Sequence, residues 1–169
     1  MTRARRAIRM FHLTVLDASR PGGDIDLERA EKLLFGSGRP VAVVPPGVSI
    51  FSAKRILVAW DSGTQAARAI NDAMPFLRAA EAVEVACVVG IRDMADTVAG
   101  AEIAPHLARH GVNVTVDDLP AYGRVEDILR NQAGLFRADL VVMGAYRHSR
   151  LREMVFDREV GPCRMVTFR

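Results

Sequence analysis

Several residue types and patterns are scarce in this chain of 169 residues, and each scarcity argues against a class of protein. Lysine occurs only twice against twenty-one arginines, the formal net charge is +3, and aromatic residues make up 6%. A nucleic-acid-binding face needs basic charge gathered on one surface beside aromatic groups, and this sequence spreads its small excess along the chain. No apolar run approaches the roughly 18–20 residues that a membrane span requires. We therefore expect neither nucleic acid nor a membrane as a partner.

The two cysteines, Cys87 and Cys163, show neither CxxC nor metal-ligand spacing. We interpret them as core thiols in a reducing compartment and expect a cytoplasmic protein. His106 and His110 form an i,i+4 pair that could in principle bind a metal. We interpret the pair as part of a solvated helix face, and we expect no metal.

The common catalytic signatures are missing from the sequence as well. It contains no GxxxxGK[ST], GxGxxG, GxSxG or HExxH motif. No arrangement of nucleophile, base and orienting group can be recognised either. The sequence therefore predicts that the protein is not an enzyme.

The chain does contain short apolar runs that alternate with amphipathic segments. Strands are predicted over residues 10–17, 40–44, 55–60, 83–89, 112–116, 140–143 and, at the end of the chain, 164–168. Helices are predicted over residues 27–35, 64–77, 94–110 and 125–136. Nearly continuous apolar strands alternating with helices indicate an α/β fold, a doubly wound parallel sheet with helices on both faces. The alternating pattern of 112–116 favours an edge strand.

One stretch of the sequence resembles another. Residues 12–20, HLTVLDASR, align without gaps to residues 139–147, DLVVMGAYR. Two buried strands of similar composition could match by chance, or residues 1–47 could be the end of an earlier copy of the domain at 48–169. No amphipathic helix of normal length fits after Phe156. Our hypothesis is that the N-terminal helix and strand complete the sheet beside residues 140–143, within the chain or swapped in a dimer.

Polar residues follow two of the predicted strands, at the ends where parallel sheets bind ligands. These candidate site residues are Asp61, Ser62 and Gly63 after the strand 55–60, and Arg147, His148, Ser149 and Arg150 after the strand 140–143. Asp61 could accept hydrogen bonds from an adenine or ribose, or could only cap the next helix, as could Ser62 or Thr64. The basic loop could hold phosphate oxygens, or could be solvated.

The order and spacing of these segments resemble the universal stress protein family. The resemblance is carried by RILVAWDSGTQAARAINDAMPFL, VEVACVV, LARHGVNVTV and ADLVVMGAYRHSRLREMVF, which cover about residues 54–156. ERAEKLLFGSGRPVAVVPPG, within residues 1–47, resembles the end of the first domain in tandem members. The resemblance implies a sheet of order 3-2-1-4-5, often dimeric through the last strand, so we expect a homodimer.

In ATP-binding members the resemblance further implies a nucleotide held by the first-strand aspartate and a G-x2-G-x9-G-[ST] motif. By position, Asp61 would meet the ribose or adenine, Val88 would line the base pocket, and Gly144 would be the first glycine. The later motif positions fall on Arg147, Asp157 and Arg158, which depart from the motif. A side chain replaces the close backbone approach that glycine allows, and the Asp157 carboxylate would repel phosphate.

From these features we expect a non-catalytic binding or stress-response protein of the universal stress type. ATP binding is expected to be weak or lost, with His148, Ser149 and Arg150 as phosphate contacts. Two alternatives remain open: a self-association module without a ligand, and a small nucleotide hydrolase that uses Asp61.

Overall fold

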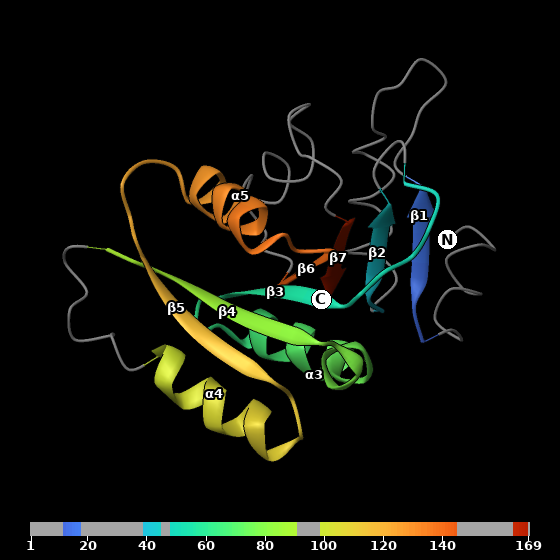
Figure 1. Cartoon of the computed structure of the whole chain (residues 1–169), viewed down its shortest axis with the longest axis horizontal. Helices are drawn as coiled ribbons and strands as arrows, with labels where there is room; N and C mark the ends of the chain where they lie inside the picture. The colour runs from blue at the N-terminus through green and yellow to red at the C-terminus, as the bar shows by residue number, and fades with distance from the viewer. Residues whose placement is uncertain (1–11, 18–38, 45–47, 91–98, 145–163, 169) are drawn as a thin grey trace, which may run out of the picture.

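Seven strands form one sheet in the computed structural model of the protein, which describes residues 12–17, 39–44, 48–90, 99–144 and 164–168 (Figure 1). The strand order across this sheet is β1-β2-β7-β6-β3-β4-β5. Its elements come from the apolar runs of the sequence, and the three described helices flank it (Figure 1).

Five neighbouring strands form a parallel unit. They are β3 (Arg55–Trp60), β4 (Ala82–Val89), β5 (Val114–Pro120), β6 (Leu140–Gly144) and β7 (Arg164–Phe168). Each is parallel to its neighbours within this unit. Counted along the chain from β3, their spatial order is 3-2-1-4-5, as the resemblance implies. This confirms the doubly wound α/β class, and β5 lies at the edge, as its alternating pattern predicted.

Two short N-terminal strands extend the sheet beyond β7. β1 (Thr14–Asp17) and β2 (Val41–Val44) are parallel to each other, whereas β2 is antiparallel to β7. The hypothesis that the N-terminal strand lies beside β6 is therefore wrong, because β7 takes that place. A parallel crossover needs only about a dozen residues, and the segment from Gly144 to Arg164 exceeds that. The predicted helix at 27–35 lies outside the described residues.

Helices cover both faces of the parallel unit (Figure 1). α3 (Thr64–Ala79) and α4 (Ala99–Arg109) lie on one face, and α5 (Val125–Phe136) lies on the other. α3 buries a stripe with three- and four-residue spacing: Ala66, Ala69, Ile70, Ala73 and Leu77. The helix continues through Pro75. Residues 94–98 of the predicted third helix lie outside the described residues.

The strands between these helices are buried on both faces. Ile56, Val58 and Val142 lie in the hydrophobic cluster with α3 and α4, whereas Leu57 and Val141 lie in the cluster with α5. All five are at most 2% exposed. Burial on both faces explains why these strands are continuous apolar runs in the sequence.

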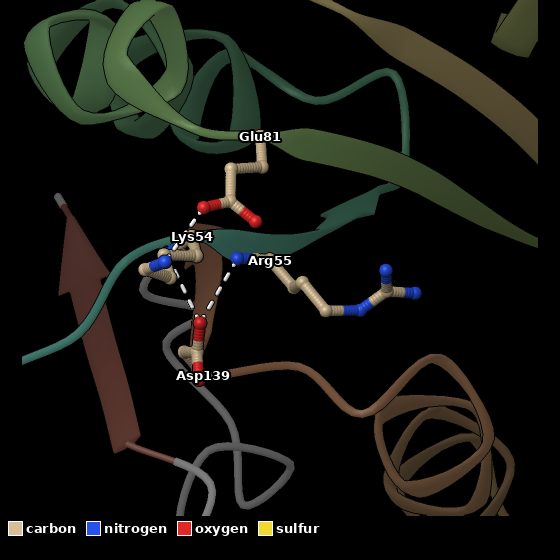
Figure 2. A network of polar contacts seen from close by, with 4 residues as sticks. All are labelled: Lys54, Arg55, Glu81 and Asp139. Atoms are coloured by element: carbon tan, nitrogen blue, oxygen red, sulfur yellow. Dashed lines mark hydrogen bonds and ion pairs between the residues drawn. The ribbon is translucent and has the colours of Figure 1, made fainter.

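A polar network joins the amino ends of β3, β4 and β6 (Figure 2). Asp139 Oδ2 accepts hydrogen bonds from the backbone N–H groups of Lys54 and Arg55, both at 3.0 Å. The Lys54 ammonium donates to Glu81 Oε1 at 2.7 Å, and this contact raises the pKa of Lys54. The Arg55 guanidinium lies over the Phe136 ring and donates a hydrogen bond to the backbone carbonyl oxygen of Phe136. Asp139 thereby ties two strands that are distant in the sequence at a fixed register.

Candidate functional site

The carboxyl ends of three neighbouring strands bring together those candidate residues of the sequence that the structure describes. The register pairs Trp60 with Cys87, so Asp61 and Val88 follow at one level of the sheet. β3 also pairs Ala59 with Met143, which places Gly144 level with Trp60. Asp61, Val88 and Gly144, which are far apart in the sequence, therefore lie within one residue of the same level. Ligands bind at this edge in open parallel sheets.

The loop after β3 is held by its own aspartate. Asp61 Oδ1 accepts a hydrogen bond of 2.8 Å from the backbone N–H of Gly63. Asp61 Oδ2 receives no hydrogen bond from the described residues, and Asp61 is exposed. Ser62 adopts a left-handed backbone conformation with φ 58°, which costs a non-glycine residue about 1 kcal/mol. Such strain is typical of loops that position a ligand contact.

The helix cap differs from the prediction. The N-cap of α3 is Gly63, and no side chain caps the helix, so neither Ser62 nor Thr64 does so. The reason is that Asp61 already binds the Gly63 N–H and turns the chain before the helix begins. The first turn of α3 contains no acidic residue, and the Asp61 carboxylate, which binds the N–H of the N-cap residue Gly63, places a negative charge beside its positive dipole end.

Gly144 is required by a close backbone approach. A Cβ added to Gly144 would lie 2.6 Å from the Ala66 backbone nitrogen and 2.7 Å from the Gln65 carbonyl carbon. Both contacts belong to the first turn of α3. Only glycine therefore lets the end of β6 touch the beginning of α3 at this distance.

Gln65 is a polar residue of this region that the sequence did not point to. Its side-chain Oε1 is buried and has no hydrogen-bond partner among the described residues. Its Cβ lies 2.9 Å from the Cβ that Gly144 would carry. A buried acceptor without a partner is costly, which makes it a candidate contact for a donor group of a ligand. Its position after a strand and at a helix start is the only signal in the sequence.

Val88 and Cys87 alternate between the two faces of β4. Val88 is partly buried and packs against the cluster beneath α5. Cys87 is 4% exposed on the opposite face, where burial and the nearby Asp118 charge raise the pKa of its thiol to about 11. The thiol is thus protonated at neutral pH. This agrees with the interpretation of Cys87 as a core thiol.

The remaining candidates are placed less fully. Arg147, His148, Ser149 and Arg150, like Cys163, Asp157 and Arg158, lie outside the described residues. The rings of His106 and His110 are edge to face on α4, with centroids 4.7 Å apart. Within the described ranges, no group of three or more His, Cys, Asp or Glu residues could hold a metal ion.

Comparison with solved structures shows which known proteins have a similar arrangement of strands and helices. A universal stress protein from Archaeoglobus fulgidus matches 97% of the chain with a TM-score of 0.69 and 16% identity. A protein of the universal stress protein family from Burkholderia pseudomallei matches 70% of the chain and 98% of its own, with a TM-score of 0.56 and 21% identity.

The chain has the universal stress protein fold. A further universal stress protein, solved in complex with cAMP, matches 70% of the chain and 99% of its own, with a TM-score of 0.51 and 17% identity. The chain spans 63% of the length of the Archaeoglobus universal stress protein. No protein-family model matches the sequence, and a search of curated proteins finds no match. Among the described helices, none is long and apolar enough to cross a membrane.

Proposed function

We propose that the chain is a non-catalytic binding protein of the universal stress type, acting in the cytoplasm, that holds an adenine nucleotide weakly at the carboxyl edge of β3, β4 and β6. The observation that carries this proposal is the common level of Asp61, Val88 and Gly144. The matching protein solved with cAMP supports a nucleotide as the class of ligand.

Each side of the nucleotide has a partner in this arrangement. Asp61 Oδ2 accepts a hydrogen bond from a ribose hydroxyl, because the hydrogen bond from the Gly63 N–H goes to Oδ1. Val88 offers an apolar surface to the base. The phosphates lie toward the amino end of α3, whose first turn carries no acidic residue, and Arg147, His148, Ser149 and Arg150 remain the phosphate contacts that the sequence predicts.

The proposed affinity is low because of the loop chemistry. Gly144 is the one motif position that keeps its glycine, and it lies against the first turn of α3. Arg147, Asp157 and Arg158 occupy the positions of two glycines and a hydroxyl residue. The Asp157 carboxylate repels phosphate, and each new Cβ keeps backbone amides away from it.

Thermal unfolding with increasing ATP tests the proposal. With a Kd of about 1 mM, ATP at ten times that concentration stabilises the chain by about 1.4 kcal/mol. Restoring the motif with Arg147→Gly, Asp157→Gly and Arg158→Ser is expected to tighten binding at least about tenfold. Asp61→Ala should abolish binding in both backgrounds, whereas Glu81→Ala, at an exposed carboxylate on the opposite edge of the sheet, should not.

If ATP shifts neither wild type nor the restored variant, nucleotide binding is refuted and self-association without a ligand becomes the better hypothesis. Steady ADP release that Asp61→Asn removes would contradict the non-catalytic proposal and favour the hydrolase.

The strand edge through which a homodimer is expected is already paired within this chain. The outer edge of β7, the last strand, is paired with β2 of the same chain. A homodimer therefore requires another surface, and we propose that the β2–β7 contact replaces the dimer contact that the resemblance implies. Light scattering of the purified chain measures its oligomeric state.

A further inference from the structure

The pairing of β2 with β7 has the register of a local two-fold axis. Ala42 pairs with Val166, and the flanking pairs are Val41 with Thr167 and Val43 with Met165. In an antiparallel pair, rotation about the central pair exchanges the two strands. A two-fold axis at Ala42 and Val166 therefore superposes β2 on β7.

The same rotation superposes the next strand on each side. β1 pairs with β2 through Val15 and Ala42, and β6 pairs with β7 through Val142 and Val166, both in parallel. The axis that exchanges Ala42 with Val166 thus exchanges Val15 with Val142.

The sequence gives this equivalence independently. The gapless alignment of residues 12–20 with 139–147 also places Val15 on Val142. A chance match of two apolar runs would not have to agree with three strand registers. The agreement supports the division of the chain into a first-domain remnant at 1–47 and a domain at 48–169.

The symmetry ends at the outer edge of β1. On β6, Val142 pairs with Val58 of β3 and lies in the cluster that α3 covers, with 0% of its surface exposed. Its equivalent Val15 is 65% exposed, and β1 has no outer neighbour among the described strands. A strand edge without a neighbour, with an exposed valine beside it, is a template for another strand.

We propose that the outer edge of β1, with the face that bears Val15, is a docking surface for a strand–helix unit from outside residues 1–169, a parallel apolar strand followed by a helix. The unit would resemble β3 and α3 and would bind by strand addition. A folded second copy cannot supply it, because its own β3 is held between β6 and β4.

A fluorescent peptide of residues 54–80, which comprises β3 and α3, is the probe for this surface. Titration with the full chain should give saturable binding by fluorescence anisotropy. Val15→Lys should weaken this binding at least about tenfold, because an ammonium would be buried under the helix. Val116→Lys on β5, the other edge strand, places the same change at a partly exposed valine and should not alter it.

Disulfide trapping tests the register of the docked strand. Val15→Cys in a Cys163→Ser background should cross-link to a peptide carrying Val58→Cys, since Val58 pairs with the equivalent Val142. A peptide carrying Leu57→Cys should react far less. Three results would each overturn the proposal. The peptide does not bind, or both lysine variants lose peptide binding equally, or Val15→Cys cross-links only to a second copy of the chain.

Discussion

Gly144→Ala should destabilise the protein through a clash with helix α3. The new Cβ would stand 2.6 Å from the Ala66 backbone nitrogen, whereas ordinary contact begins at 3.4 Å, so α3 must withdraw by roughly 0.8 Å. The obstacle is backbone, and no rotamer change relieves it. Overpacking of this kind costs about 1–3 kcal/mol.

Two other glycines provide matched controls for the same substitution. Gly134 lies inside α5 with nothing within 4 Å of an added Cβ, so Gly134→Ala should stabilise the protein by about 0.5–1 kcal/mol. Gly111 is also open, but its φ of 80° is left-handed, so Gly111→Ala should cost about 1 kcal/mol through backbone strain alone.

Urea unfolding measures the series, with far-UV circular dichroism and the fluorescence of Trp60, the single tryptophan. Gly144→Ala and Gly134→Ala should differ by about 2–4 kcal/mol, which is roughly 1–2 M in the midpoint at an m-value of about 2 kcal/mol/M. If Gly144→Ala unfolds at or above the wild-type midpoint, the close approach of β6 and α3 does not hold.

Three further predictions use the same unfolding measurement. Asp139→Ala removes two hydrogen bonds to backbone N–H groups and should cost about 2 kcal/mol, against less than about 1 kcal/mol for the exposed control Asp127→Ala; equal losses would refute the role of Asp139. Ser62→Gly should stabilise the chain by about 0.5–1 kcal/mol because it relieves a left-handed conformation, and a loss would contradict that strain. The raised pKa of Cys87 means that the native thiol keeps its proton while the unfolded thiol ionises, so stability should fall between about pH 9 and pH 11. Cys87→Ala should flatten this decline, and an unchanged slope would refute it.

The sequence predicted which strand ends form the candidate site, but not the contacts that its residues make. Asp61 and Gly144 each follow an apolar run, and parallel strands bring such ends to one edge. The role of Asp61 as an acceptor for its own loop, and the contact of Gly144 with α3, depend on which backbones meet. For Gln65 the sequence offers only its position at a helix start, because the burial of its side-chain oxygen depends on tertiary packing.

By itself, the sequence determined the α/β class, the extent of most described elements and the edge position of β5, since these follow from periodic burial along a local stretch. The tertiary structure alone decided that β2 joins β7 in antiparallel and that Val15 is exposed where Val142 is buried. The physical reason is that an apolar run predicts a buried strand, but it does not identify the strands that lie beside it. Neighbours are set by hydrogen bonds and crossovers between residues distant in the chain.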